Sequence, residues 1–333
     1  MWQMVSEAVA WNDALHRTEQ PHVLQSWEWG EFKSRWGWTA QRWALRDENG
    51  RPRALMQVLR RTMGPLRALY VPKGPLTAPD VLAYDQALEW LERLARTQRA
   101  VWVKLDGDVC SPALNLNQAR EVLRRRGWVF SSAQVQFRNT AHTDLQADDD
   151  TLLARMKPKW RYNIRLAERR GVQVRLAQPD DYQTLYRLYA ETAARDGFII
   201  REPAYYFDAW RTMGATGFIA EKEDRALAGL ILFTFADRAW YFYGMSSSEG
   251  REHMPNHLLQ WTAMRWARDQ GCRIYDWWGA PEQLDPSDPL WGVYRFKEGF
   301  GAHLVEGLGA WDYAPSALLY RLAVRLYRSA IGR

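Results

Sequence analysis

The chain has 333 residues, 47% of them hydrophobic and 25% charged, and it carries a formal net charge of +6. This length and balance exclude a disordered chain and allow two domains, each with a core of its own. Cys110 and Cys272 lie far apart and no CxxC spacing occurs, so we expect reduced thiols and no bound metal. Because no N-terminal apolar leader and no apolar run of about 18 residues is present, we expect a cytoplasmic protein.

The N-terminal part of the chain predicts alternating strands and helices. Ser26 can cap a helix at residues 27–36, on which Trp29, Phe32 and Trp36 share one face. The apolar periodicity predicts further helices at residues 5–17, 80–97 and 118–126. It predicts strands at residues 40–46, 53–61, 67–71, 100–105 and 133–145.

Residues 151–175 concentrate the positive charge of the chain. They hold eight basic residues and one acidic residue, a net charge of 8 − 1 = +7 against +6 for the whole chain. Pro158 and Gly171 are placed to begin and end a helix of about three turns. One face of that helix carries Arg161, Arg165 and Arg169. We expect this row to bind phosphates, as in RNA or a diphosphate, and the alternative is a solvated basic helix without a ligand.

The order of strand, strand, helix and strand occurs twice, at an offset of roughly 170 residues. The second copy comprises residues 226–235, 239–244, 257–270 and 272–276. Its last strand ends at Asp276, much as the last strand of the first copy ends at Asp106. The duplication predicts two similar α/β domains, residues 1–147 and 148–311, with a substrate cleft between them.

Residues 315–330 predict a terminal amphipathic helix with a basic face. We expect the segment 312–333 to rejoin the first domain, so that the apolar face of the helix is buried there. The alternative is a basic helix that lies on the anionic inner face of the membrane, which would make the protein a peripheral one.

Familiar catalytic signatures are absent from the sequence. It has no HExxH, GxSxG or Walker motif, and no GxGxxG that opens a helix after a strand. The histidines show no metal-ligand spacing, so we interpret His257 and His303 as structural. An enzyme of this kind has to position two substrates and stabilise the charge that develops between them. The 19 tryptophans and 15 tyrosines suit a groove for sugar, base or peptide.

Four stretches of the sequence carry a resemblance to a known family. They are residues 25–33, 160–172, 258–271 and 295–301. In this order they resemble motifs of the FemABX family of peptidoglycan-bridge aminoacyltransferases. The resemblance implies an α/β fold of two tandem GNAT-like domains, that is, domains like the acyl-CoA N-acyltransferases. Because residues 170–201 leave no room for a long coiled-coil arm, the chain resembles the compact members of the family.

The resemblance implies a reaction and two partners. An amino acid would pass from aminoacyl-tRNA to the side-chain amine of the diamino acid in the stem peptide of a peptidoglycan precursor, either UDP-linked or lipid-linked. Lys33 and Arg201 would hold the diphosphate or uridine end of this precursor. Further contacts would come from Tyr205, Tyr206 and Tyr243. No cofactor is implied, and we expect a monomer.

Within residues 295–301, Lys297 is the candidate catalytic residue. An ammonium there would stabilise the carbonyl oxygen that becomes anionic when the amine attacks the ester, and Phe296 would form a wall of the acyl pocket. The alternative is a surface strand of alternating charges. Asp106 and Asp108 are candidates for the base that deprotonates the acceptor amine, and a turn-forming role for this segment is equally open.

By the same resemblance, the tRNA acceptor stem would be bound through its backbone charge by Lys159, Arg161, Arg165 and Arg169. Two other functions stay open. An acyl-CoA-dependent N-acetyltransferase of the same fold would need a Gly-rich pyrophosphate loop, of which residues 246–251 are only a faint echo. A non-catalytic RNA-binding protein would use the arginine row but leave Lys33, Arg201 and Lys297 without a role.

Overall fold

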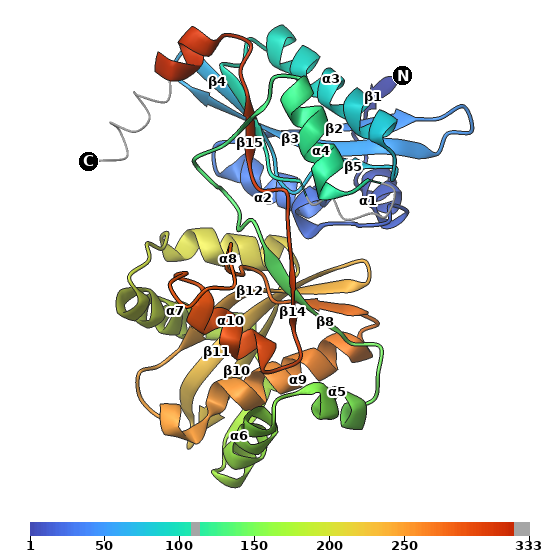
Figure 1. The fold of residues 1–333 in the computed structure, drawn as a ribbon. Helices are drawn as coiled ribbons and strands as arrows, with labels where there is room; N and C mark the ends of the chain where they lie inside the picture. The colour runs from blue at the N-terminus through green and yellow to red at the C-terminus, as the bar shows by residue number, and fades with distance from the viewer. Residues whose placement is uncertain (108–113, 323–333) are drawn as a thin grey trace. The chain divides into compact units, whose positions relative to one another are not determined.

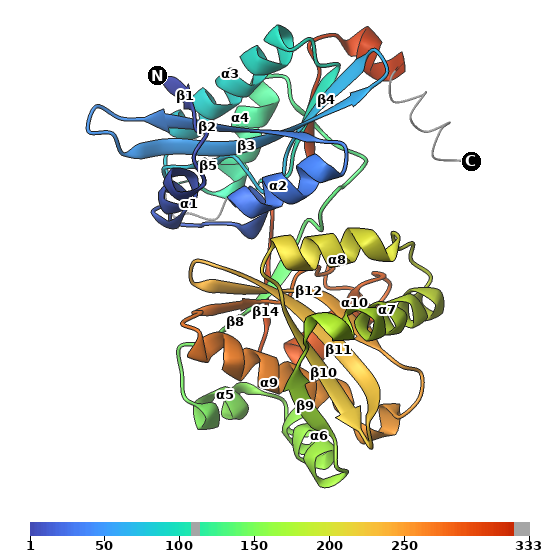
Figure 2. The same ribbon diagram turned by 180° about the vertical axis from the view of Figure 1, so that it is seen from behind.

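A computed structural model of the chain describes residues 1–107 and 114–322. The chain divides into two compact units, of which the first comprises Met1–Arg138 and Glu306–Arg333 and the second Asn139–Val305. Each unit is built around a mixed β-sheet of its own (Figures 1 and 2).

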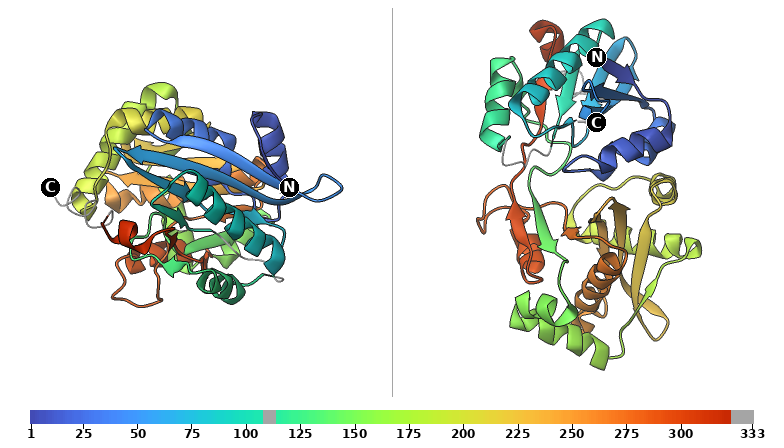
Figure 3. Two further views of the ribbon diagram at one scale, coloured as in Figure 1. Left: turned by 90° about the horizontal axis from the view of Figure 1, so that it is seen from above. Right: turned by 90° about the vertical axis from the view of Figure 1, so that its right-hand side faces the viewer.

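The first unit holds an eight-stranded sheet. In sheet order its strands are β1 (Trp2–Met4), β2 (Thr39–Arg46), β3 (Pro52–Met63), β4 (Leu66–Val71), β6 (Trp102–Leu105), β15 (Trp311–Tyr313) and β7 (Val129–Phe130), and β5 (Leu76–Thr77) pairs with β3. Its helices are α1 (Ala8–His16), the 3-10 helix η1 (Val23–Gln25), α2 (Trp27–Arg35), α3 (Val81–Thr97) and α4 (Leu116–Arg125). α3 and α4 pack together on one face of the sheet, and α2 lies on the other (Figure 3, right).

Helix α3 shows how the sequence builds this unit. The side chain of Asp80 caps the helix by accepting a hydrogen bond from the amide of Ala83 at 2.7 Å. Tyr84, Leu88 and Leu91 recur at helical spacing and are fully buried in the core beneath the helix. Burial of each side chain of this size stabilises the fold by about 1.5–3 kcal/mol.

The second unit holds a seven-stranded sheet. In sheet order its strands are β14 (His303–Val305), β8 (Thr140–Asp144), β13 (Ile274–Asp276), β12 (Arg238–Ser246), β11 (Arg225–Phe235), β10 (Thr216–Lys222) and β9 (Gln173–Leu176). Its helices are α5 (Asp149–Arg155), α6 (Pro158–Arg169), α7 (Tyr182–Asp196), α8 (Pro203–Thr212), α9 (Pro255–Asp269) and α10 (Trp291–Glu298), with the 3-10 helices η2 (Pro179–Asp181) and η3 (Arg251–His253).

Helices cover both faces of the second sheet. Leu185 of α7 packs over Gly229 of β11, whereas the next residue, Leu230, belongs to the core that α9 covers. Because successive side chains of a strand point to opposite faces, α7 and α9 lie on opposite sides of the sheet. α6 packs along α9, which anchors the basic helix to this unit.

The two sheets share one topology, as the repeated sequence pattern predicts. In the first sheet β2, β3 and β4 run antiparallel and β4 is parallel to β6, and in the second β10, β11 and β12 run antiparallel and β12 is parallel to β13. β15 lies between β6 and β7, and β8 takes the corresponding place between β13 and β14. The expected α/β fold with a duplicated sheet is confirmed.

Strand pairing sets the limits of the two units. β8 pairs with β13 and β14, so the second unit begins at Asn139, whereas the sequence analysis begins it at residue 148. β15 pairs with β6 and β7, so the C-terminal segment returns to the first unit from Glu306 rather than from residue 312. The part of the expected C-terminal helix that follows residue 322 lies outside the described residues.

One predicted strand is shorter in the structure, and several elements of the second unit are not predicted. The strand expected at residues 133–145 is confined to β8, because the preceding residues form a loop held by side chains. In that loop, Lys104 donates a hydrogen bond to the carbonyl of Ala133 at 2.9 Å, and Gln134 donates one to the carbonyl of Ser131 at 2.7 Å. The sequence pattern also predicts none of α7, α8, β9 and β10.

Candidate active site

In the second sheet, β12 separates from β13 part-way along its length. The two strands pair only as far as Trp240, although β12 continues to Ser246. The register of β12 against β11 shifts between Ile231 and Leu232, which leaves Phe242 as an extra, bulged residue. A bulge bends its strand and increases the twist, so β12 diverges from β13 beyond this point.

Trp278 lies beside the diverging strands. Its ring stacks on that of Phe242, with ring centroids 4.6 Å apart. Its φ of 54° is in the left-handed region, which is uncommon for a residue with a side chain. The amide of Trp278 donates a hydrogen bond to the carboxylate of Asp276 at 2.9 Å. This backbone geometry turns the carbonyl groups of Trp278 and Gly279 toward one side chain, that of Lys297.

Lys297 belongs to α10, and its side chain points into the second unit, where the residue is only 4% exposed. Its Nζ donates hydrogen bonds to the carbonyl oxygen of Trp278, at 2.8 Å, and to that of Gly279. Burial lowers the pKa of Lys297 to about 7, against the opposing effect of the Asp276 carboxylate. The alternative of a surface strand of alternating charges is wrong, because the residue is helical and buried.

The ammonium of Lys297 keeps one hydrogen-bond donor. A protonated lysine has three N–H bonds, and among the residues that the structure describes the Nζ has two acceptors. One N–H therefore has no acceptor among these residues. Because two backbone carbonyls fix its position, the group needs little reorganisation when negative charge develops beside it.

Asp276 is 2% exposed and ends β13 beneath this site. Besides the amide of Trp278, its carboxylate binds the hydroxyl of Thr140, and it pairs with Nε2 of His142 at 3.0 Å. Burial alone would raise the pKa of this carboxyl, but the hydrogen bond and charge of His142 and the charge of Arg238 bring it below the ordinary value. Asp276 is thus a fixed negative charge at neutral pH.

Phe296 packs in an aromatic cluster next to Lys297. The centroid of its half-buried ring lies 5.3 Å from that of His257 and 5.2 Å from that of Phe300. Burial, together with the charge of Lys159, lowers the pKa of His257 to about 4, so its imidazole is neutral at physiological pH. The expected role of Phe296 as a wall of the acyl pocket stays a prediction.

Gly299 follows α10 because no side chain fits there. A Cβ at this position would lie 2.1 Å from the ring of Trp160. We expect Gly299→Ala to displace Trp160 and to cost about 1–3 kcal/mol of unfolding free energy, measured as a drop of several degrees in Tm. Gly292→Ala in α10 is the control, because no atom lies within 4 Å of its added Cβ, and it should be neutral or slightly stabilising. Equal Tm values for the two variants would contradict this contact.

Arg201, which precedes α8, lies at a cluster of tyrosines. Its guanidinium carbon is 4.7 Å from the ring centre of Tyr205, and its amide donates a hydrogen bond to the hydroxyl of Tyr206 at 3.1 Å. Tyr206 contacts Tyr243 of β12, with ring centroids 5.5 Å apart. Burial raises the pKa of all three tyrosines, so their hydroxyls are neutral donors at physiological pH. These four residues, which the resemblance assigns to one site, are brought together.

A series of aromatic contacts joins this tyrosine cluster to Lys297. The ring of Tyr243 lies 5.2 Å from that of Phe242, and Phe242 stacks on Trp278. The carbonyl of Trp278 in turn accepts the hydrogen bond from Lys297. Arg201, the three tyrosines and the expected catalytic lysine therefore lie along one path within the second unit.

Lys33 belongs to the first unit and lies in α2. Ser26 caps this helix as predicted, because its hydroxyl accepts a hydrogen bond from the amide of Trp29 at 3.2 Å. The Nζ of Lys33 lies 5.5 Å from the ring centres of Trp29 and Phe32 and 5.9 Å from that of Trp38. Three aromatic faces thus hold the half-buried ammonium in place.

Asp106 directly follows β6, and its carboxylate orders a turn. It is 2% exposed and accepts hydrogen bonds from the hydroxyl of Tyr70 at 2.6 Å and from the amide of Lys73 at 2.7 Å. β4 and β6 stay paired to their last residues, so they do not diverge as β12 and β13 do. This geometry supports the turn-forming alternative, and the role of Asp106 as a base stays a prediction. Asp108 lies outside the described residues.

The expected basic helix is present as α6, and its cations differ in exposure. Lys159, Arg165 and Arg169 are exposed, and the guanidinium of Arg169 lies 5.7 Å from the ring centre of Tyr162. Arg161 is half-buried, because its guanidinium donates hydrogen bonds to carbonyl groups at the C-terminal end of α5. The solvent-facing cations of α6 are therefore Lys159, Arg165 and Arg169.

Comparison with known proteins places the chain in a family. The sequence model of the FemAB family matches residues 11–219 and 210–328, which together make up almost the whole chain. The chain belongs to the FemAB family. The resemblance to FemABX proteins is thereby confirmed. Lipid II:glycine glycyltransferases of Staphylococcus aureus, for example those of strains USA300 and MRSA252, are 25% identical to it over 93% of this chain and 94% of their own length.

Solved structures resemble this FemAB-family chain over nearly its full length. A crystal structure of FemX matches it with a TM-score of 0.86 and 23% identity, covering 97% of this chain and 99% of that one. A tandem GNAT protein from the clavulanic acid biosynthesis pathway matches with a TM-score of 0.60 and 15% identity, covering 95% and 99%. At these identities the likeness shows the fold alone, and that fold is the expected tandem of GNAT-like domains.

Sequence reasoning on this FemAB-family chain misses three residues near Lys297. They are Asp276, which supplies a buried negative charge, His142 and Trp278. The one signal in the sequence is the parallel between Asp276 and Asp106 at the ends of equivalent strands. None of the helices in residues 1–107 and 114–322 combines the length and apolar character that a bilayer span requires. Over the same residues, no three His, Cys, Asp or Glu side chains are grouped as metal ligands.

Proposed function

We propose that this protein transfers an aminoacyl group from aminoacyl-tRNA to the side-chain amine of the diamino acid in the stem peptide of a peptidoglycan precursor. The observation that carries the proposal is the buried Lys297, whose Nζ is held by two carbonyls and keeps one N–H for a substrate oxygen. The activity named for the Staphylococcus aureus relatives, lipid II:glycine glycyl transfer, supports a peptide-bridge reaction and a lipid-linked precursor.

The proposed reaction exchanges an ester for an amide. The acceptor nitrogen attacks the carbonyl carbon of the aminoacyl ester, the new C–N bond forms, and the bond from that carbon to the ribose oxygen of the tRNA breaks. The nitrogen loses one proton and the released ribose hydroxyl gains one. In the tetrahedral intermediate the carbonyl oxygen is anionic, and the N–H of Lys297 donates to it, which is worth about 3 kcal/mol of barrier.

In this proposal the precursor is bound by the tyrosine cluster, Arg201 and Lys33. The guanidinium of Arg201 and the ammonium of Lys33 bind the diphosphate, and the faces of Tyr205, Tyr206 and Tyr243 carry the sugar and base. The ring series that leads from Tyr243 to Trp278 supports this assignment, because it ends at the catalytic ammonium. The stem peptide lies along these rings with its acceptor amine at Lys297.

The exposed cations of α6 bind the acceptor stem of the tRNA. We expect the double variant Arg165→Gln, Arg169→Gln to raise the KM for aminoacyl-tRNA about tenfold with kcat little changed, because each arginine contributes one backbone phosphate contact. Steady-state assays at 50 and 200 mM salt measure this effect, which should shrink at the higher salt. The control is the double variant Arg225→Gln, Arg273→Gln, which removes the same charge from exposed arginines that pair with Glu249 and Asp237. An equal rise in KM for both variants would assign the effect to net charge alone.

A reconstituted assay tests the proposed function directly. Purified protein is incubated with individually charged tRNAs and with either the UDP-linked or the lipid-linked precursor, and mass spectrometry detects the aminoacylated stem peptide. Acetyl-CoA is tested in parallel, because an acetylated amine would establish the N-acetyltransferase alternative. Binding of tRNA with no product from any tRNA and precursor pair would favour the non-catalytic alternative and sink the proposal.

In the cell, we expect a strain that lacks this protein to lose the side-chain branch of its muropeptides. Mass spectrometry of digested cell wall measures the branch as a mass increment on the stem peptide. Expression of the wild-type gene should restore this increment, and expression of a Lys297→Met gene should not. A wall unchanged by the deletion is the opposite outcome.

A further inference from the structure

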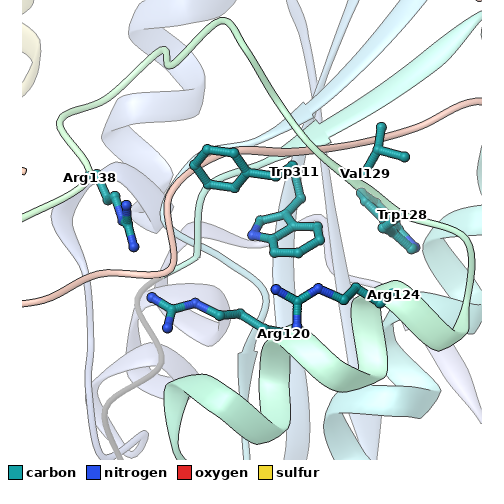
Figure 4. A pocket seen from close by; sticks show the side chains of 7 residues that line it. Arg120, Arg124, Trp128, Val129, Arg138 and Trp311 are labelled. Carbon is teal, nitrogen blue, oxygen red and sulfur yellow. The ribbon is translucent and has the colours of Figure 1, made fainter.

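A pocket of about 560 Å³ lies in the first unit, lined by residues of α4, of β7 with its neighbours, and of β15. Figure 4 shows its lining side chains, with the guanidinium group of Arg124 below the ring of Trp311 and the side chain of Arg120 extended toward the side on which Arg138 lies. None of these residues belongs to the set that the proposed transfer uses. The pocket is therefore separate from the residues of the proposed transfer.

The pocket holds an excess of positive charge. Arg120 and Arg124 are one helical turn apart on α4, and Arg138 lies across from them. Burial and the like charges of Arg138 and Arg124 lower the pKa of Arg120, and Glu306 only partly opposes this effect. The Nη2 of Arg120 is buried and has no hydrogen-bond partner among the described residues. A bound anion would relieve both the repulsion and the missing bond.

Aromatic rings lie beside these cations. Phe130 is 48% exposed, and its ring meets that of Trp311 edge to face with centroids 5.7 Å apart. The guanidinium of Arg124 lies 5.8 Å from the ring centre of Trp311, and that of Arg138 lies 5.7 Å from the ring centre of Phe130. Large apolar rings are normally buried, so the half-exposed ring of Phe130 beside the Arg138 guanidinium offers a stacking surface in a pocket lined by further arginines.

We propose that this pocket binds a nucleotide unit, with its phosphate on the guanidinium groups of Arg120 and Arg124 and its base against the exposed ring of Phe130. Arginine matches the geometry of phosphate oxygens, and an aromatic face accepts any base by stacking. A free nucleotide and a single-stranded end of an RNA present this same chemistry. The inference stands whether or not the chain transfers an aminoacyl group.

Three variants and three probes test the site. The probes are AMP, inorganic phosphate and a fluorescent single-stranded octamer of adenylate, measured by calorimetry for the first two and by anisotropy for the third. Arg124→Gln should weaken binding of all three about tenfold, because a charge-assisted bond to phosphate is lost. Phe130→Ala should weaken AMP and the octamer about fivefold and leave inorganic phosphate unchanged. Arg125→Gln is the matched control, since this neighbour on α4 is 65% exposed and pairs with Asp85.

The same titrations are repeated in a Lys33→Ala, Arg201→Ala background, so that nucleotide held by the proposed precursor site is not counted. Binding that survives there and falls with Arg124→Gln supports the pocket, and a ratio of octamer to AMP affinity well above one assigns the RNA as the source. The inference is overturned if Arg124→Gln and Arg125→Gln weaken binding equally, or if Phe130→Ala leaves AMP unaffected. Sedimentation with vesicles of phosphatidylcholine and phosphatidylglycerol at 3:1 is a further measurement. The inference is also overturned if Arg124→Gln weakens binding to these vesicles but leaves binding of AMP, phosphate and the octamer unchanged. Unchanged Tm values show that each variant is folded.

Discussion

Replacement of Lys297 by Met is expected to reduce aminoacyl transfer by about 100-fold or more while precursor binding stays within twofold of wild type. The ammonium acts on an oxygen that becomes anionic only as the tetrahedral intermediate forms, so its loss affects kcat rather than the affinity for the precursor. Single-turnover transfer and calorimetry with the precursor measure the two quantities separately. Near-normal turnover by Lys297→Met would remove the residue from the reaction.

The stability of the Lys297→Met variant distinguishes this loss from misfolding. Burial that lowers the pKa of Lys297 from 10.5 to about 7 costs the wild-type fold a few kcal/mol, and the apolar Met relieves that cost. The carbonyls of Trp278 and Gly279 lose their donor in exchange, which costs about 1–3 kcal/mol each. Because the two effects oppose each other, Tm should change by only a few degrees. Lys222→Met, a partly exposed lysine of the same unit, is the control and should retain full activity.

The pH dependence of stability checks the origin of the pKa shift. Because the pKa of Lys297 is lower in the folded chain than in the unfolded chain, the unfolded state binds more protons between about pH 7 and 10. The free energy of unfolding of the wild type should therefore rise with pH in this window relative to that of Lys297→Met. A difference between the two proteins that stays constant from pH 6 to pH 9 would contradict a buried, depressed lysine.

Local patterns in the sequence predict the helices and strands whose apolar residues repeat regularly. α3 is predicted within one residue at its N-terminal end because its leucines keep a helical spacing, and the structure adds the cap by Asp80. α8 is missed because Tyr205 and Tyr206 make up half of its buried residues, and α7 is missed because its partly buried Tyr182, Tyr186 and Tyr189 blur the spacing of Leu185 and Leu188. A tyrosine is apolar in its ring and polar at its tip, so the contrast on which periodicity depends is weakened.

Residues of the site that belong to a sequence motif are predicted, and residues that only the tertiary structure brings together are missed. The motif at residues 295–301 identifies Lys297 but not its burial, because a lysine between an arginine and other charged residues usually faces solvent. Asp276 owes its role to Thr140 and His142, which are distant in the sequence and reach it only because β8 pairs with β13. No local pattern contains that pairing.

The nucleotide pocket shows the same division between local and tertiary information. Arg120 and Arg124 sit four residues apart on a predicted helix, so their common face follows from the sequence alone. Trp311 comes from the far end of the chain and joins them only because β15 inserts between β6 and β7. The C-terminal segment that returns to the first unit therefore contributes to the pocket as well as to the sheet.

Replacement of Asp276 by Asn is expected to lower transfer activity at neutral pH by about tenfold, with a deficit that grows as the pH rises. Asn has the same shape and can still accept the hydrogen bond from the amide of Trp278, so the backbone around Lys297 is kept. It lacks the negative charge that raises the pKa of Lys297 against burial. The pKa of the ammonium therefore falls further, and a smaller fraction of the enzyme carries the proton that the reaction needs.

The measurement is the ratio of kcat/KM for Asp276→Asn to kcat/KM for the wild type as a function of pH. The titration of the acceptor amine is common to both enzymes and cancels in this ratio, so the ratio reports the protonation of Lys297. At pH values below both lysine pKa values the ratio should approach a plateau, because Lys297 is protonated in both proteins. It should fall through the neutral range and level off again once Lys297 is deprotonated in both. A ratio that does not vary between pH 5.5 and 8.5 would show that Asp276 serves the site through its shape and hydrogen bonds and not through its charge.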